Sequence, residues 1–252
     1  MSAEPLAAVT FDFWETLVRD SPDNLVRARA RRIESLKALL EDAGCAHPLP
    51  ALEQAHERCG EEMTARFWAA NREPSIQDQV HLFFDCVESG LCDRLDAEIF
   101  ARAVEAYGAP ASEYPPDLMP GARDAVRALA ARGVRLGIVS NTGRTPGVVL
   151  RRILDRYDLL RYFETIAISY SDEVGFRKPD GRIFTRTLQA LGVTPGRALH
   201  VGDNPHDDVA GARACGMRTA HYAIGGCVPS PVADVIVGDL GDLPERLARF
   251  LA

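Results

Sequence analysis

The first apolar run of the chain is short, rich in β-branched and aromatic residues, and carries one acidic position near its end. It covers residues 6–13 and reads Leu-Ala-Ala-Val-Thr-Phe-Asp-Phe. A run of this length and composition predicts a buried β-strand. The carboxyl end of that strand is then expected to present the carboxylate of Asp12.

After residue 20 the apolar positions change to helical spacing. Over residues 24–43 they mark one face of a helix, made of Leu25, Ile33, Leu36, Leu39 and Leu40. The same periodicity predicts three more helices, over about 50–70, 76–90 and 96–107. A stretch containing Gly and Pro at 108–116 ends the region, which is therefore predicted to be an all-helical insertion.

Strands and helices alternate in the remainder of the chain. The predicted strands are 134–140, 165–169, 198–203, 219–222 and 234–237. The predicted helices are 120–132, 148–157, 182–191 and 207–215. Repeated strand–helix units are typical of a parallel sheet with helices on both faces. The sequence thus predicts an α/β fold whose core is a Rossmann-like, doubly wound parallel sheet, covering 1–19 and 113–252, with the helical insertion at 20–112.

Composition narrows the class of protein. The chain has 252 residues, of which 46% are hydrophobic and 26% charged, with a formal net charge of −7. These values are ordinary for a globular enzyme, and they exclude a disordered tail protein. The absence of a basic excess argues against a nucleic-acid partner. It does not exclude a small phosphorylated substrate, because a metal ion and a few local cations can reverse the field within one pocket.

The cysteines and the apolar segments indicate the compartment. The six cysteines form no CxxC pair and no Cys/His ligand spacing, so we expect reduced thiols. No apolar stretch approaches the length of about 18 residues that a membrane span needs, and no leader pattern is present. We therefore expect a soluble cytoplasmic protein without a membrane partner, either a monomer or a homodimer.

Polar residues follow the ends of the predicted strands. They are Asp12, the pair Ser140-Asn141, Lys178 in the loop after 165–169, Asp203, and Asp208 five residues further on. In parallel sheets, ligands bind beyond the carboxyl ends of the strands. Taken singly, each residue also fits a turn or a helix cap. Taken together they predict one site at one edge of the sheet.

Three carboxylates at one edge repel one another unless a cation lies among them. Oxygen ligands without Cys or His favour Mg²⁺. The ammonium group of Lys178 could keep Asp12 ionised and contact a phosphoryl oxygen, and Ser140 and the Asn141 amide could donate hydrogen bonds to the other oxygens. Only two of the 29 basic residues are lysines, at positions 37 and 178, so a lysine in this loop is conspicuous.

Four segments carry a resemblance to a known family. Phe-Asp-Phe-Trp-Glu-Thr-Leu-Val, Val-Ser-Asn, Lys-Pro-Asp and Gly-Asp-Asn-Pro-His-Asp-Asp resemble, in order and spacing, the four motifs of the haloacid dehalogenase superfamily. The helical insertion resembles its cap domain, in the arrangement that places the cap after the first motif. The resemblance spans the whole chain and is specific for the superfamily rather than for a substrate.

The resemblance implies a role for each of the motif residues. Asp12 would attack phosphorus to give an aspartyl-phosphate, and the phosphoryl group would be held by Ser140, Asn141, Lys178 and Thr16. Mg²⁺ would be held by Asp12, Asp203 and the backbone carbonyl of Trp14, with Asp208 supporting the water shell of the metal or Lys178. The implied activity is hydrolysis of a small phosphorylated metabolite.

The chain departs from the family pattern at Trp14. Phosphatases of the superfamily have a second Asp here, which protonates the leaving oxygen; loss of such a group costs about 10²–10⁴ in rate. One interpretation is a phosphatase that is slow, uses a good leaving group or borrows another acid. Glu15, Glu62 and His56 are the candidates for that acid.

Three alternatives remain open. Haloacid dehalogenases also have an aromatic residue at this position, but they do not need the metal and lack the Gly202-Asp203 pair. Phosphonoacetaldehyde hydrolase uses a cap lysine as a Schiff base, which directs attention to Lys37, although a pair with Glu41 or Asp42 one helical turn away suits its setting better. The last alternative is a catalytically impaired protein that binds a ligand or partner through its cap.

The cap contains further candidate residues. Arg66 and Arg72 could bind a second anionic group and Trp68 could stack on a ring, although packing of the cap core and solvation of its face explain them better. The arginines of the first helix wind around it, so we expect them to be solvated: Arg27, Arg29, Arg31 and Arg32. His200 and His206 flank the fourth motif without an assigned role.

Overall fold

A six-stranded parallel sheet forms the centre of the computed structural model, which describes residues 4–251. Its strand order is β5-β4-β1-β6-β7-β8, and every neighbouring pair is parallel. The strands are β1 (Ala8–Phe11), β4 (Arg135–Ser140), β5 (Ile168–Tyr170), β6 (Ala198–Gly202), β7 (Arg218–Tyr222) and β8 (Val235–Val237). The predicted α/β fold with a doubly wound sheet and an inserted helical segment is confirmed.

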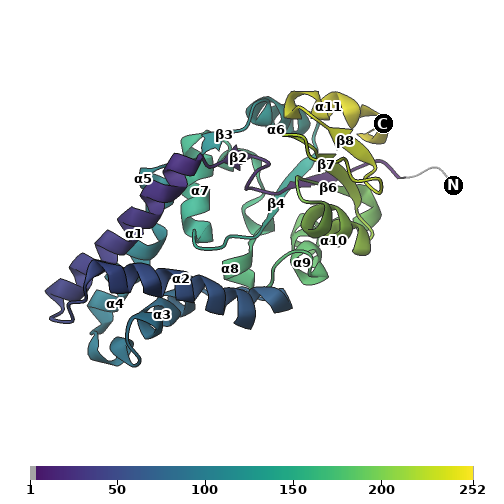
Figure 1. Ribbon diagram of the computed structural model, residues 1–252. Coiled ribbons are helices and arrows are strands. Elements are labelled where there is room, and N and C mark those ends of the chain that lie inside the picture. The colour runs from purple at the N-terminus through teal and green to yellow at the C-terminus, as the bar shows by residue number, and fades with distance from the viewer. Residues whose placement is uncertain (1–3, 252) are drawn as a thin grey trace.

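Helices cover both faces of the sheet (Figure 1). They are α6 (Ala122–Ala131), α7 (Gly147–Arg156), α8 (Ser171–Val174), α9 (Gly181–Leu191), α10 (Gly211–Ala214), α11 (Leu243–Arg246) and α12 (Ala248–Leu251). Because side chains alternate along a strand, Val9 packs in the cluster with α6, α7 and α11. Ala8, its neighbour, packs in the cluster with α9 and α10.

Four longer helices form the inserted segment, followed by the short α5 (Pro110–Glu113). They are α1 (Pro22–Asp42), α2 (Leu49–Arg66), α3 (Ile76–Val87) and α4 (Ala97–Gly108). Their apolar faces enclose a hydrophobic cluster of their own, centred on residues such as Leu36, Leu52 and Phe83. This separate core supports the predicted cap, and its limits at residues 20 and 112 remain a prediction.

Polar residues at their N-termini begin three of the longer helices. Ser21 accepts a hydrogen bond from Asn24 N, and Asp96 accepts one from Ile99 N. Ser75 and Asp78 form a reciprocal capping box at α3. Each cap supplies an acceptor for an N–H group that has no partner within its helix, so these helices begin where the sequence provides such a side chain.

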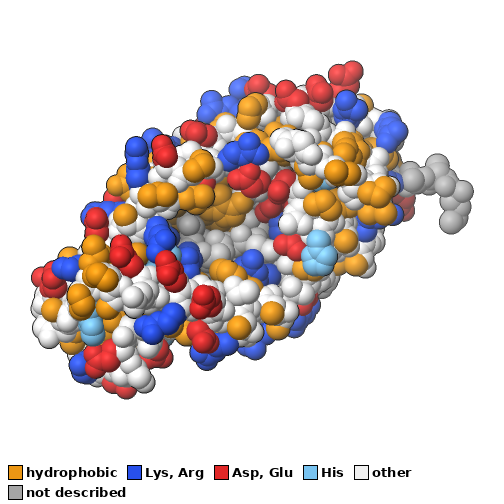
Figure 2. All heavy atoms as spheres, viewed as in Figure 1, with side chains coloured by type: hydrophobic (Ala, Val, Ile, Leu, Met, Phe, Trp, Pro, Cys, Tyr) orange, Lys and Arg blue, Asp and Glu red, His pale blue; other side chains and the backbone are white. Residues whose placement is uncertain are grey.

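The insertion leaves and rejoins the core through a short antiparallel pair, β2 (Val18–Arg19) and β3 (Asp117–Leu118). In Figure 1 the helices α1 to α4 extend away from the sheet beyond this pair. Figure 2 shows a hollow at the centre of the same face, between the helical insertion and the sheet. No helix within the described residues is long and apolar enough to cross a membrane.

Two predicted elements differ in the structure. Residues 165–167 form a 3₁₀ turn, and strand β5 begins only at Ile168. Ile166 gives the segment its strand-like composition, yet its side chain is 70% exposed, so no burial favours extension there. The predicted helix 207–215 is a π-helical turn over Pro205–Ala210, followed by α10. The Asn204 side chain accepts hydrogen bonds from the N–H groups of residues 206 and 207 and begins this turn early.

Candidate active site

The register of three adjacent strands brings the predicted residues together. Phe11 at the end of β1 pairs with Ile138 of β4 and with Val201 of β6. Asp12 follows β1 directly, Ser140 ends β4, and Asp203 follows β6. Because β1 lies between β4 and β6, the carboxyl ends of all three meet at the point where the strand order reverses. Ligands of doubly wound sheets bind at this type of position.

Lys178 lies between two of the predicted carboxylates. Its Nζ is 2.8 Å from Oδ1 of Asp12 and 2.6 Å from Oδ1 of Asp208. All three side chains are buried. Removing charges from water is costly unless they are paired, and here a single ammonium group pairs with two carboxylates.

Burial and pairing shift the pKa values of this trio in different directions. Burial raises the pKa of Asp12, and the Lys178 ammonium offsets part of that rise. Burial also acts on the other two groups, but their neighbours outweigh it. Asp12 and Asp208 raise the pKa of Lys178 to about 12. Lys178 and His200 hold the pKa of Asp208 well below its usual range. Lys178 is therefore charged at neutral pH.

Asp208 is held by three donors, which sequence reasoning identified only in part. Oδ1 accepts from Lys178 and from Nε2 of His200, and Oδ2 accepts from the backbone N–H of Asn204 at 2.9 Å. Gly202 makes room for this arrangement, since a Cβ there would lie 2.2 Å from Asp208 Cγ. These contacts favour the role of holding Lys178 over direct metal ligation. The metal role expected for Asp208 stays a prediction.

Two histidines that received no role from the sequence support the site. His200 is fully buried and bridges Thr10 Oγ1 and Asp208 Oδ1 at 2.9 and 3.0 Å. His221 donates from Nε2 to the backbone carbonyl of Asp203, because its Nδ1 accepts from Ser230 N. The only available signal was the position of each residue within a buried strand, which the chain shares with many residues that lack a function.

Asp203 completes an acidic group. One carboxylate oxygen from each of Asp12, Asp203 and Asp208 lies within 4.8 Å of the others. Burial, together with Asp12 and Asp208, raises the pKa of Asp203 to about 7. The rise measures how unfavourable a further negative charge is at this place. A divalent cation would relieve that repulsion, and the donors are the hard oxygens that Mg²⁺ prefers.

Two buried hydroxyl groups at the site lack partners. Among the described residues, Ser140 Oγ and Thr16 Oγ1 have no hydrogen-bond partner. Buried hydroxyls are normally satisfied, so these two are suited to oxygen atoms of a ligand. Asn141 differs, because its side chain binds the backbone of Lys178, accepting from N at 2.8 Å and donating to O at 3.2 Å. It fixes the lysine loop, and its expected contact with phosphate stays a prediction.

Trp14 lies at the junction of the core and the cap. Its ring packs edge-on against Phe13 at 5.0 Å between centroids, and it lines a cavity of about 500 Å³ that also reaches the cap helices. Of the three acids considered as replacements, Glu15 and His56 line the same cavity. Glu15 is paired with Arg19. Burial and the cations around it lower the pKa of His56 to about 3, so its imidazole is neutral at pH 7.

The remaining candidates lie on the cap. Glu62 is exposed, 3.8 Å from Arg66. Arg66 and Arg72 stack over the ring of Phe67, and Trp68 packs against the cap core and donates to Glu73. None of the three aromatic or cationic cap candidates lines the cavity beside Trp14. Lys37 pairs with Glu41, as expected.

One expectation for the first helix is wrong. Arg32 is buried rather than solvated, with its Nε 2.7 Å from the carbonyl oxygen of Tyr107 and its guanidinium over the Tyr107 ring. Helical periodicity alone places it among the other arginines. The packing of α1 against α4 decides its burial, and the contact satisfies a backbone acceptor inside the cap.

A buried glutamate attaches the cap to the loops of the site. Glu73, between α2 and α3, accepts from Ser171 Oγ at 2.8 Å and pairs with Arg177. Ser171 Oγ in turn accepts from Thr142 N at 2.8 Å. Arg177 directly precedes Lys178, and Thr142 follows the Ser140-Asn141 pair. The cap therefore contacts both loops that carry the predicted phosphate-binding residues.

Known proteins resemble this chain both in sequence and in structure. Phosphoserine phosphatase from Thermus thermophilus is 36% identical over 141 residues, which are 55% of this chain and 54% of that protein. About half the length of such curated relatives is matched. A 2-haloacid dehalogenase from Pseudomonas syringae superposes with a TM-score of 0.71 at 25% identity, covering 97% of this chain and 99% of the other.

A second solved structure, a HAD phosphatase from Thermococcus onnurineus, gives a TM-score of 0.62 at 25% identity, covering 96% of this chain and 98% of the other. The model of one family, described as haloacid dehalogenase-like hydrolase, matches residues 6–216. That match includes the strand ends that carry Asp12, Ser140, Lys178 and Asp203, together with the inserted helices. The chain belongs to the haloacid dehalogenase-like hydrolase family.

Proposed function

We propose that the protein is a Mg²⁺-dependent phosphatase that acts on a small phosphorylated metabolite, with Asp12 as its nucleophile. The observation that carries this proposal is the buried contact of Lys178 with Asp12 and Asp208, beside a third carboxylate at Asp203. Two relatives are named for small phosphorylated metabolites, as phosphoserine phosphatase and glyceraldehyde 3-phosphate phosphatase, and this supports the proposal.

Asp12 is suited to attack because its contacts orient it. In the described part of the chain, Phe13 N and Lys178 Nζ both contact Oδ1, at 2.7 and 2.8 Å. Oδ2 would form the new bond to phosphorus while the bond from phosphorus to the ester oxygen breaks, and the leaving alkoxide takes up a proton. Water would then cleave the aspartyl-phosphate, which releases inorganic phosphate and restores Asp12.

Lys178 and the unpartnered hydroxyls would bind the group that is transferred. The ammonium is already fixed between two carboxylates, so no reorganisation is needed when charge builds up on the phosphoryl oxygens. Thr16 Oγ1 has no partner among the described residues, and Ser140 Oγ lies beside the Asp12 carboxylate, so both can donate to the same oxygens. This set of donors supports a tetrahedral anion as ligand better than it supports a halide.

The residues present fit a divalent cation. Asp12 and Asp203, with the carbonyl of Trp14, would hold Mg²⁺, and Asp208 would hold Lys178. When bound, the metal neutralises charge on the phosphoryl group and on the carboxylates. The raised pKa of Asp203 supports this assignment, because a carboxyl beside two others is readily ionised only when a cation is close.

Trp14 predicts a preference for good leaving groups. Its indole cannot donate a proton to an alkoxide, and the neutral His56 and the paired Glu15 do not replace the missing acid. A substrate whose leaving group is a weak base needs little protonation. We therefore expect p-nitrophenyl phosphate to be turned over faster than simple alkyl phosphates.

The test is Mg²⁺-dependent hydrolysis of p-nitrophenyl phosphate by wild type and by Asp12→Asn. We expect activity that is lost with a chelator and reduced on the order of 10⁴-fold or more in the variant. Undiminished turnover in Asp12→Asn would remove the nucleophile, and therefore the proposal.

Dehalogenation is the second candidate, favoured by the aromatic Trp14 and by the similarity to a 2-haloacid dehalogenase. Displacement of halide from carbon needs neither the metal nor an acid for the leaving group. This candidate predicts halide release from 2-haloacids in the presence of a chelator, measured with the same two proteins. The Asp203 carboxylate, which that reaction does not use, weighs against it.

A further inference from the structure

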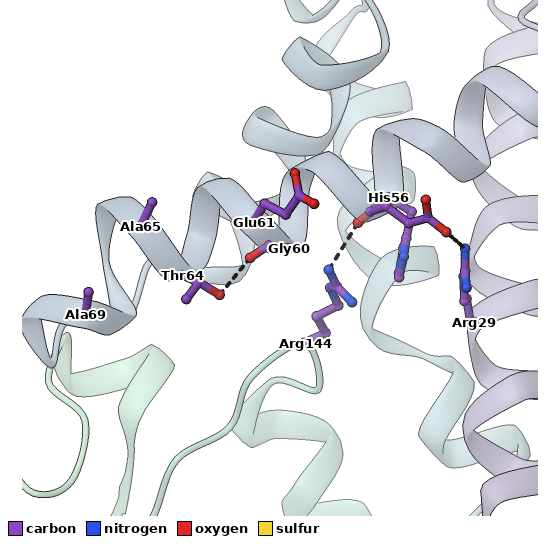
Figure 3. A pocket seen from close by; sticks show the side chains of 9 residues that line it. Arg29, His56, Gly60, Glu61, Thr64, Ala65, Ala69 and Arg144 are labelled. Atoms are coloured by element: carbon purple, nitrogen blue, oxygen red, sulfur yellow. Dashed lines mark hydrogen bonds and ion pairs between the residues drawn. The ribbon is translucent and has the colours of Figure 1, made fainter.

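Two cavities meet where the cap faces the core. One has a volume of about 700 Å³ and is shown in Figure 3, and the other, of about 500 Å³, extends to Trp14, two residues after Asp12. Three residues line both: Arg29 of α1, His56 of α2 and Arg144 of the loop after β4. The two spaces thus share one wall, and that wall is rich in cations.

Arg144 enters this wall from the core. In Figure 3 its side chain points from the loop toward α2, where Nη2 donates to the carbonyl oxygen of His56 at 3.2 Å. Gly60 leaves room for it, because a Cβ there would lie 2.6 Å from Nη2. Glycine inside a helix costs about 1 kcal/mol relative to alanine. Helix α2, which carries Gly60, therefore accommodates the Arg144 guanidinium at a cost to its own stability.

Glu57 and Glu61 line the larger cavity beside Arg29 and Arg144, yet only part of the positive charge at this wall is paired. Arg29 is paired with Glu57 at 2.8 Å, and Glu15, on the opposite side of the smaller cavity, is paired with Arg19. Within residues 4–251, neither Arg32 nor Arg144 has a carboxylate within 4.0 Å, although both line the smaller cavity. Asp20 is the remaining acidic group there, and burial raises its pKa to about 6.

Two buried polar atoms of the wall also lack partners. His56 is 4% exposed, and its Nε2 has no hydrogen-bond partner among the described residues. The same holds for Nε of Arg144. Unsatisfied buried polar atoms are costly. An acceptor with a negative charge would satisfy Nε of Arg144 and the unpaired cations, and also Nε2 of His56 in the tautomer that carries the proton on that nitrogen.

We propose that Arg144, with Arg32 and His56 beside it, forms a subsite for a second anionic group of the substrate. The substrate is accordingly a small phosphate ester that carries a carboxylate or a second phosphate. This inference rests on the proposed phosphatase function. Arg144 lies four residues after Ser140, so one loop serves both ends of such a molecule: its start faces the transferred phosphoryl group and its end faces the second anion.

The experiment compares three esters that share one carbon skeleton: glycerol 3-phosphate, 3-phosphoglycerate and glycerol 1,3-bisphosphate. We expect wild-type kcat/KM to be about 10- to 100-fold higher for the two esters with a second anion, the usual value of a charge-assisted hydrogen bond. Arg144→Gln should lower this ratio of kcat/KM values to near 1, mainly by raising KM for the two esters with a second anion. Arg144→Lys should restore part of the ratio. The better of the two anionic esters distinguishes carboxylate from phosphate.

The matched control is Arg27→Gln, which removes an exposed arginine of α1 that lines neither cavity and should keep the wild-type ratio. Equal kcat/KM for the three esters in wild type, or a ratio unchanged in Arg144→Gln, would overturn the subsite. Calorimetry on Asp12→Asn separates the two proposals. If no ester is hydrolysed but 3-phosphoglycerate still binds more tightly than glycerol 3-phosphate, and only with Arg144 present, the subsite stands while the phosphatase function fails.

Discussion

Two clusters of charged residues lie at this site, and they differ in how far their charges are paired within the protein. At the strand ends, Lys178 is paired with Asp12 and Asp208, and Asp208 accepts further hydrogen bonds from His200 and from Asn204 N. At the cap–core wall, Arg32 and Arg144 have no acidic partner within residues 4–251, and among the same residues His56 has an unsatisfied nitrogen. In the first cluster the ion pairs of the lysine are formed within the fold. The second is left open, so a ligand can complete it.

The difference follows from what each cluster must do. In the proposed phosphatase, chemistry at phosphorus would be common to every substrate, and a preorganised ammonium group serves it best when fixed by the protein itself. Recognition distinguishes one substrate from another, and it requires groups that gain partners only on binding. Accordingly, rigid strands of the core carry the first cluster, while helices of the cap and a single loop carry the second.

The largest effect is expected from removing the centre of the closed cluster. Lys178→Met leaves Asp12 and Asp208 buried without their cation, which should lower the free energy of unfolding by about 3–5 kcal/mol. Urea unfolding measures this loss. The matched control is the other lysine, because Lys37 pairs with Glu41 on an open helix face. Lys37→Met should change the free energy by less than about 0.5 kcal/mol; similar losses in both variants would contradict the closed cluster.

A change at the junction of the two clusters is expected to raise activity. Trp14→Asp supplies the acid that the leaving oxygen lacks, so kcat on an alkyl phosphate such as glycerol 3-phosphate should rise by about 10²-fold. The gain on p-nitrophenyl phosphate should be much smaller, because its leaving group needs little protonation. Steady-state kinetics with both esters measure the contrast. An equal rate of alkyl ester hydrolysis in wild type and variant would mean that another group already donates the proton.

A smaller effect is expected from the support of the closed cluster. His200→Ala removes hydrogen bonds to Thr10 and Asp208, both buried, and should cost about 1–3 kcal/mol of stability. His206→Ala is the control, because that histidine is exposed and its ring hydrogen-bonds only to its neighbour Asp207 among the described residues. Thermal or urea unfolding compares the two. An equal loss of stability in His206→Ala and His200→Ala would show that the hydrogen bonds of His200 add nothing to stability.

The open cluster predicts the smallest effect, seen in the pH dependence of stability. Burial, with Arg144, Arg32 and Arg29, lowers the pKa of His56 from 6.5 to about 3. Below pH 6.5 the His56 imidazole is protonated in the unfolded chain but stays neutral in the folded chain, so stability falls as pH falls. Between pH 6.5 and 5.5 wild type should lose about 1 kcal/mol more than His56→Asn. Unfolding at both pH values measures this difference, with His81→Asn as a control. An equal loss of stability in wild type and in His56→Asn would contradict the buried, cationic surroundings of His56.

The sequence anticipated more of the closed cluster than of the open one. Asp12, Ser140, Lys178 and Asp203 follow strands whose apolar composition makes them visible, and parallel strands bring their carboxyl ends to one edge. Burial of Arg32 could not be read in the same way, because it depends on a contact with Tyr107, 75 positions away. Arg144 was not singled out either, since nothing in its local sequence indicates that Gly60 of a distant helix makes room for it.

Local pattern therefore determined the elements of this protein: a parallel sheet with an inserted helical segment, and acidic and basic side chains at the strand ends. Periodicity and turn residues act over a few positions, and a single chain displays them directly. Tertiary structure alone decided which charges are paired and which are left open. Glu73, His200 and Arg144 gain their partners across distances of 98, 190 and 88 positions, and contacts of that range arise only when distant segments pack together, within the core for His200 and between cap and core for the other two.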